Sequence, residues 1–146
     1  MEQKEQQKRR KHYETIIIFS PDLNASDLQA AVAKNMEILA QGQSALLRHD
    51  DWGKLKMAYE INKHAMGHYF YFRFISEAEA LTSFERNLKL DSSVLRFRTI
   101  RLSQDLTKDQ EQEIINKAPQ EASTSPALRA EDEEGMHYSH YSAYGS

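Results

Sequence analysis

Apolar and polar residues follow one another along the chain in blocks, and each block has the period of one kind of secondary structure. Residues 12–19 are rich in Ile, Thr, Tyr and Phe, and this nearly continuous apolar run predicts a strand buried on both faces. Ser26 and Gln29 have the spacing of a capping box, after which apolar residues recur at helical spacing through 28–39. A first helix is therefore expected, and it should end near Gly42.

The next two blocks have the period of strands. Residues 44–61 alternate between apolar and polar, and Gly53 in their middle predicts a bulge or bend. Trp52, the sole tryptophan, is expected to pack beside this bulge rather than to stand free as a stacking platform. Residues 68–75 are a third strand, joined to the second through the polar stretch 62–67. Together the two strands are expected to form a hairpin.

The last two blocks are a helix and a strand. Ser76 and Glu79 predict a second capping box, and the apolar stripe through 81–88 predicts a helix that ends around 90–91. Residues 94–102 are a fourth strand. The order strand, helix, strand, strand, helix, strand indicates an α+β, ferredoxin-like βαββαβ fold, with a four-stranded antiparallel sheet and two helices on one face.

The other face of this sheet is expected to be open, and the last strand indicates what decorates it. Alternation assigns Leu95 and Phe97 to the helix side and Arg96 and Arg98 to the open face. Arginines beside sheet aromatics suit contact with phosphates and nucleobases. Ordinary solvated charge on an antiparallel sheet is the simpler interpretation from the residues alone.

Charge divides the chain into an arm, a domain and a tail. Residues 1–10 are polar and end in a basic run, which predicts a flexible basic arm before a folded domain at 11–102. From Arg9 to Leu102 there are 14 Lys and Arg against 11 Asp and Glu, whereas residues 103–146 have 3 against 9. The tail is therefore acidic, and its Gln, Glu, Ser and Ala composition predicts disorder, with room for one short helix around 109–117.

Composition argues against most kinds of chemistry. The chain has no cysteine, and its longest apolar run, 16–19, is far too short for a membrane span or a signal peptide, so a soluble, unexported protein without a membrane association is expected. Asp50 and Asp51 point to opposite faces of a strand, which disqualifies them as an acid-base pair. His137 and His140 in the tail would make a poor metal site without a scaffold. We expect no enzyme activity, cofactor, metal or small-molecule substrate.

Three groups of short strings resemble bacterial small-subunit ribosomal protein six. Each group is an ordered set of residues at the usual spacing of that family: 11–16 with 20–23, then 51–53 with 57–63 and 67–69, and finally 90–91 with 94–96 and 101–102. Together they cover about residues 10–102. Two departures are the longer arm before Lys11 and Glu60, where the family commonly has proline.

The resemblance implies a structural constituent of the small ribosomal subunit, located in the cytoplasm. It implies binding of central-domain small-subunit ribosomal RNA together with ribosomal protein eighteen, as a heterodimer that supports platform assembly in translation. The residues it favours as RNA or partner contacts are Arg10, Lys11, Tyr13, Lys54, Lys56, Lys63, Arg96 and Arg98.

Two other classes of function remain open on the fold alone. Ferredoxin-like domains can bind small regulatory ligands, which would call for a Gly-rich turn where this chain has Ser20-Pro21-Asp22. A ferredoxin-like nuclease would need a cluster of metal-binding carboxylates at the sheet edge, and the residues predict none.

Overall fold

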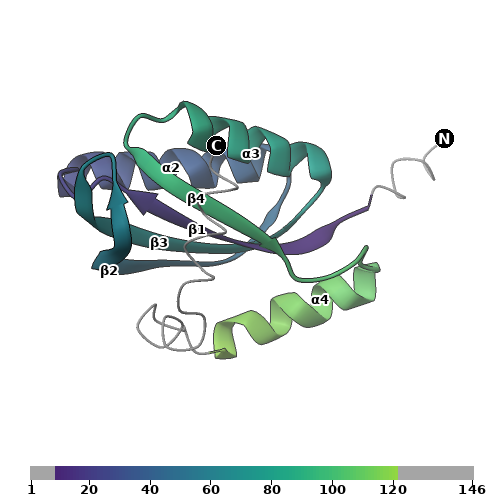
Figure 1. The fold of residues 1–146 in the computed structure, drawn as a ribbon. Helices are drawn as coiled ribbons and strands as arrows, with labels where there is room; N and C mark the ends of the chain where they lie inside the picture. The colour runs from purple at the N-terminus through teal and green to yellow at the C-terminus, as the bar shows by residue number, and fades with distance from the viewer. Residues whose placement is uncertain (1–8, 122–146) are drawn as a thin grey trace.

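A four-stranded antiparallel sheet forms the centre of the computed structural model, which describes residues 9–121. The strands are β1 (Lys11–Phe19), β2 (Ala45–Ile61), β3 (His64–Ser76) and β4 (Val94–Arg101), in the order β2-β3-β1-β4. Helices α2 (Ala25–Gln41) and α3 (Ala78–Leu90) cover one face (Figure 1). The ferredoxin-like prediction is confirmed. The predictions for the arm before Arg9 and for the tail beyond Glu121, including His137 and His140, lie outside the described residues.

Both helices begin at residues other than the predicted caps. The N-cap of α2 is Asn24, whose side-chain Oδ1 accepts a hydrogen bond from the backbone N–H of Asp27 at 2.7 Å. The N-cap of α3 is Glu77, without a side-chain cap. The predicted capping boxes at Ser26 and Ser76 are therefore wrong. For α2, Asn caps a helix as well as Ser does, and Asn24 lies nearer to the end of the preceding turn. For α3, the hydroxyl of Ser76 donates to the carbonyl oxygen of Glu77 at 2.7 Å and does not cap the helix. Helix α2 ends at Gly42, as expected.

The main core lies between the sheet and these two helices. Phe72 and Phe74 of β3 are fully buried and meet Phe84 of α3 edge-on, with ring centroids 5.8 and 5.3 Å apart. Such edge-to-face pairs add to the stabilisation that comes from apolar burial. The main core also contains Ile17 and Tyr13 of the central strand β1. Burial of β1 on both faces, predicted from its continuous apolar run, is confirmed, because Ile16 and Ile18 are buried on the opposite side.

A second, smaller core lies on the face away from α2 and α3. Ile16 and Ile18 pack there against Tyr69 of β3 and against Met57 and Ile61 from the far end of the β2–β3 hairpin. The hairpin bends over the face that the sequence predicted to be open.

The hairpin turn is tighter than predicted. Asn62 and Lys63 both have positive φ, 51° and 69°, and Ile61 pairs with His64. The connection is thus a two-residue turn of the kind that matches the twist of a hairpin, and β3 begins four residues earlier than the predicted start at His68.

One assignment in β4 is also corrected. The register between β1 and β4 shifts beside Phe19, because Phe19 pairs with Val94 and Ile18 pairs with Arg96. Leu95 is the extra residue and packs in the second core, whereas Phe97 remains in the main core as predicted. A bulge of this kind reverses the alternation of side chains at one position.

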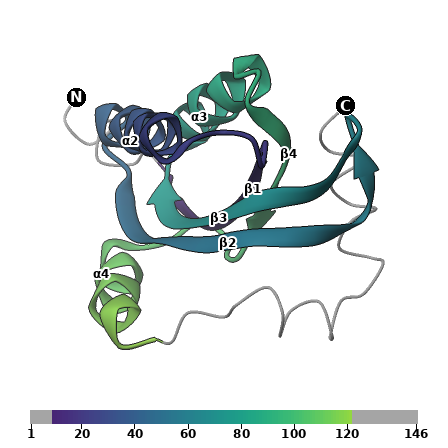
Figure 2. The same cartoon turned by 90° about the vertical axis from the view of Figure 1, so that its left-hand side faces the viewer.

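The chain continues past β4 as an ordered segment on the second face of the sheet. Helix α4 (Lys108–Lys117) and a short 3-10 helix, η1 (Ala118–Gln120), lie on the opposite side from α2 and α3 (Figures 1 and 2). Thr107 and Gln110 form a reciprocal capping box at the start of α4. The short helix expected around 109–117 is confirmed, whereas disorder is wrong for residues 103–121.

Candidate nucleic-acid interface

The two arginines of β4 lie on the face away from α2 and α3. Arg96 pairs with Ile18 and Arg98 with Ile16, and residues paired directly across strands share a face. Both arginines are half-buried, and Nη1 of Arg96 donates to the carbonyl oxygen of Leu95 at 3.0 Å. Within residues 9–121 neither arginine forms an ion pair with a carboxylate. No carboxylate among the described residues therefore neutralises their charges.

Three lysines decorate the β2–β3 hairpin. Lys54 and Lys56 lie on β2, Lys63 lies in the turn, and all three are exposed. In the described part of the chain no carboxylate pairs with any of the three. The hairpin contacts the start of β4, because Met57 and Ile61 share the second core with Leu95. The structure thus brings the hairpin close to the strand that carries Arg96 and Arg98.

The predicted contact residues at the start of β1 are engaged within the protein. Nε of Arg10 pairs with Glu111 of α4 at 3.2 Å, and its Nη1 donates to the carbonyl oxygen of Gln43 at 2.6 Å. Nζ of Lys11 pairs with Asp105 at 2.7 Å, and this hydrogen bond holds the pKa of Asp105 below its ordinary value. Tyr13 is buried in the main core, so its ring does not face a ligand.

Two further arginines form a cationic pair that the sequence analysis did not single out. Arg48 of β2 and Arg73 of β3 lie directly opposite each other. Arg48 pairs with Asp50 at 3.1 Å, and its Nη1 donates to the carbonyl oxygens of Ala118 and Glu121 at 3.3 and 2.6 Å. Nη2 of Arg73 pairs with the carboxylate of Glu121. The available signal was Arg73 itself, a single charge within the aromatic run of β3.

His12 lies beside this pair and remains deprotonated more readily than an ordinary histidine. Burial lowers the pKa of His12 most strongly, and the positive charge of Arg73 lowers it further, whereas Glu121 and Glu14 raise it. His12 Nε2 and Arg73 Nε are buried, and neither has a hydrogen-bond partner among the described residues. The site therefore has hydrogen-bonding capacity that the described residues do not use.

The aromatic residues of this face pack on each other. Trp52 stacks on Tyr71 with ring centroids 5.0 Å apart and ring planes 12° from parallel, next to the register shift between Asp51 and Gly53. This confirms the prediction that Trp52 packs beside a bulge. The hydroxyl of Tyr71 donates to the buried carboxylate of Glu14 at 2.7 Å. This hydrogen bond fixes the ring of Tyr71, on which Trp52 stacks.

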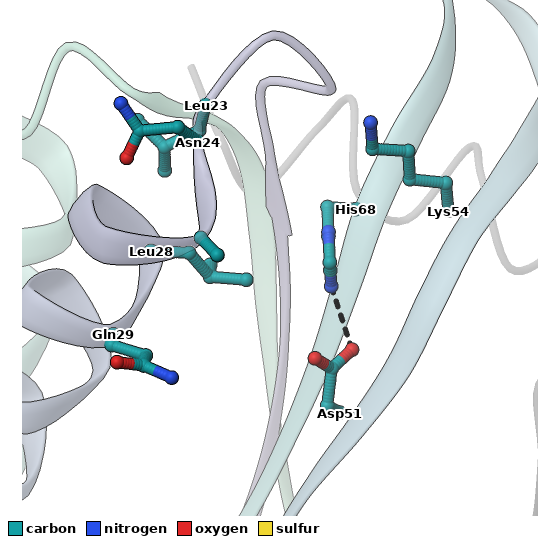
Figure 3. A pocket seen from close by; sticks show the side chains of 8 residues that line it. Leu23, Asn24, Leu28, Gln29, Asp51, Lys54 and His68 are labelled. Carbon is teal, nitrogen blue, oxygen red and sulfur yellow. Dashed lines mark hydrogen bonds and ion pairs between the residues drawn. The ribbon is translucent and has the colours of Figure 1, made fainter.

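An open pocket of about 360 Å³ lies at the start of α2, between that helix and the hairpin. Figure 3 shows His68 and Asp51 on the strand side of this pocket, joined by a contact of 2.6 Å, with Leu28 facing them from α2. Asp51 also accepts a hydrogen bond from the backbone N–H of Gly53 at 2.8 Å, and Asn24 is occupied as the helix cap. Asp51, His68 and Asn24 thus bond within the protein, and these three groups do not favour a small-molecule site.

Residues 9–121 contain no cluster of three or more side chains suited to hold a metal ion. None of the helices in this part of the chain has the length and apolar character that a membrane crossing requires.

The fold and its surface cations define a ferredoxin-like α+β domain suited to a polyanionic partner. Residues 12–101 match the family model described as Ribosomal protein S6. The match covers more than half of the chain, and the chain therefore belongs to the ribosomal protein S6 family.

Individual relatives agree with this membership. The chain is 41% identical over 93 residues to small ribosomal subunit protein bS6 of Geobacter metallireducens, and this alignment covers 64% of this chain and 79% of that protein. It is 36% identical over 121 residues to small ribosomal subunit protein bS6 of Geobacter sulfurreducens, and this alignment covers 82% of this chain and 97% of that protein. The crystal structure of 30S ribosomal protein S6 from Thermotoga maritima has a similar fold, with a TM-score of 0.61 and 21% sequence identity. The match covers 77% of this chain and 100% of the Thermotoga maritima chain.

Membership assigns the general role. The chain is a structural, non-enzymatic protein of the small ribosomal subunit and is located with the ribosome in the cytoplasm. A position in that subunit implies contact with ribosomal RNA, in agreement with the expectation drawn from the sequence.

Proposed function

We propose that the chain binds the central domain of small-subunit ribosomal RNA together with ribosomal protein eighteen, as a heterodimer that supports assembly of the platform. The choice of this RNA region and this partner comes from the resemblance of residues 10–102 to ribosomal protein six. The observation that carries the RNA contact is the position of Arg98, a half-buried cation on the sheet face away from α2 and α3. Within residues 9–121 it has no anionic partner.

The predicted contact residues divide into three groups by their accessibility. Five of them have no carboxylate partner between residues 9 and 121 and lie on one strand or on the hairpin beside it: Lys54, Lys56, Lys63, Arg96 and Arg98. Arg10 and Lys11 are engaged by the carboxylates of Glu111 and Asp105 and would become available only if those pairs opened. Tyr13 supports the strand from the core.

The test is binding to a central-domain RNA fragment, with and without ribosomal protein eighteen, across a salt series. Each phosphate that a cation neutralises contributes about 0.7 to 0.9 to the slope of log affinity against log salt. We expect Arg98→Gln to weaken binding and to flatten the slope by about that amount.

A matched control is available on the opposite side of the molecule. Arg86→Gln removes an exposed arginine from α3, which covers the other face, and should leave the slope unchanged. Absence of binding at low salt, with and without ribosomal protein eighteen, would refute the proposed function. An unchanged slope for Arg98→Gln would refute the contact at Arg98 only.

A further inference from the structure

The segment after β4 forms ion pairs with basic side chains at and just before the start of β1. We call residues 103–121 the C-terminal strap. Its Asp105 pairs with Arg9 at 3.1 Å and with Lys11 at 2.7 Å. Its Glu111 pairs with Arg10 at 3.2 Å. These pairs place the acidic part of the chain against the basic part, although the two are far apart in the sequence.

The end of the strap occupies an anion site built by Arg48 and Arg73. Like charges directly opposite each other on neighbouring strands repel, so this pair requires an anion. The carboxylate of Glu121 supplies it for Arg73, and the carbonyl oxygens of Glu121 and of Ala118, the C-cap of α4, accept hydrogen bonds from Arg48. Asp50 offsets part of the charge of Arg48. The two guanidinium groups thus converge on one short stretch of the strap.

The strap does not satisfy this site completely. Nε of Arg73 and Nε2 of His12 are buried beside Glu121 and have no partner among the described residues. A guanidinium group presents its donors in a planar fork that matches two phosphate oxygens at once. A phosphodiester group therefore suits the Arg48–Arg73 site at least as well as a single glutamate does.

The strap is held mainly by polar contacts. Helix α4 contains no buried residue, and Ala118 is the only residue of η1 that is buried. Its ion pairs are partly exposed, with side-chain exposures of 14% and 47% for Arg73 and Glu121. Exposed pairs contribute little stability and weaken with salt, and segments with few buried apolar contacts open at low cost.

We propose that Arg48 and Arg73 form a phosphate site for RNA, that the C-terminal strap occupies it as an internal anion, and that RNA displaces the strap. The inference rests on the proposed function and deepens it, because it names a contact site outside β4 and the hairpin. Displacement would also release Arg10 and Lys11. The strap then competes with RNA for the Arg48–Arg73 site and lowers the affinity of the protein for RNA.

The test compares two full-length variants that each remove one negative charge from the strap. Glu121→Gln removes the carboxylate that faces Arg73. Glu113→Gln is the matched control, because Glu113 pairs at 4.0 Å with Lys117 of the same helix. At low salt we expect Glu121→Gln to bind the central-domain RNA fragment about two- to fivefold more tightly than wild type, the effect of one partly exposed ion pair. Glu113→Gln should bind like wild type.

Hydrogen exchange reports the position of the strap directly. The backbone N–H of Leu106 donates to the carbonyl oxygen of Arg10 at 2.9 Å, and the amides of α4 are hydrogen-bonded within the helix. RNA binding should increase exchange at Leu106. The double variant Arg48→Gln/Arg73→Gln should bind more weakly and flatten the salt slope by about 0.7 to 0.9, the contribution of one phosphate, provided that it remains folded by circular dichroism.

The outcomes separate this inference from the proposed function. RNA binding by wild type, with equal affinities for the two Glu variants and no change in exchange at Leu106, would overturn the strap mechanism and leave the proposed function intact. Weaker binding by Glu121→Gln would place the strap within the RNA-binding surface and overturn displacement. Faster exchange at Leu106 with ribosomal protein eighteen alone would make a protein, rather than RNA, the occupant.

Discussion

Gly67 permits β3 to pass close to the central strand, and the substitution Gly67→Ala tests how tightly the hairpin is fitted there. A Cβ atom at this position would lie 2.3 Å from Cγ2 of Ile18 and 3.3 Å from Sδ of Met57. Carbon atoms in contact are ordinarily about 3.5 to 4.0 Å apart, so Ile18 or the strand must move by more than about 1 Å. Ile18 is fully buried in the central strand and cannot move aside alone.

We therefore expect Gly67→Ala to lower the free energy of unfolding by about 1 to 3 kcal/mol, the usual cost of adding a methyl group to a filled core. For a domain of this size the melting temperature should fall by roughly 4 °C per kcal/mol. The assay is urea unfolding monitored by the fluorescence of Trp52, the single tryptophan, which stacks on the same face of the sheet.

A double-mutant cycle identifies the cause. Ile18→Ala removes the methyl group that clashes, so Gly67→Ala should cost much less in the Ile18→Ala background than in wild type. Equal costs in the two backgrounds, or no cost in wild type, would refute the steric argument. The same clash should displace the hairpin that carries Lys54 and Lys63, and RNA affinity should fall with stability.

Two further predictions concern the turn and the pH dependence. Lys63→Gly should raise the free energy of unfolding by about 0.5 to 1 kcal/mol, because Lys63 has a φ of 69° that glycine adopts without strain. Lys56→Gly, within β2, is the control and should lower the free energy of unfolding. The urea midpoints of the two variants, compared with wild type, check both expectations. The pKa of His12 is lowered in the folded protein, so the unfolded chain binds more protons as the pH falls through 6.5, and stability should be lost from about that pH downward. His12→Gln should show a shallower fall in its urea midpoint over this range, and an unchanged pH profile would contradict the assigned shift.

The sequence was sufficient for the order of the elements because each element carries its own period. The apolar run of β1, the stripe of α3 and the alternation of β4 are local patterns, and local patterns survive in the fold. Within the strands, the exceptions arise where geometry depends on a partner strand. Leu95 changed face because β4 shifts register against β1, and no residue near Leu95 in the sequence records that shift.

The candidate site was predictable only in part for a similar reason. Arg96 and Arg98 were assigned to the correct face because strand alternation places them there. Arg48 and Arg73 were missed because their importance comes from each other and from Glu121, which meet only through sheet register and the path of the strap. The capping box at Thr107 and Gln110 is a local pattern that the prediction of a disordered tail did not take into account.

The position of β1 in the middle of the sheet has a consequence for the order of folding. The first strand to be synthesised pairs with β3 on one side and with β4, the last strand, on the other; Tyr13 pairs with Arg101. Both edges of β1 therefore pair with strands that lie far along the sequence. Folds in which most contacts join residues distant in the sequence form slowly. During synthesis, one edge of β1 stays unpaired until β3 emerges and the other until β4 emerges, so the isoleucine-rich strand is exposed to aggregation for most of this period.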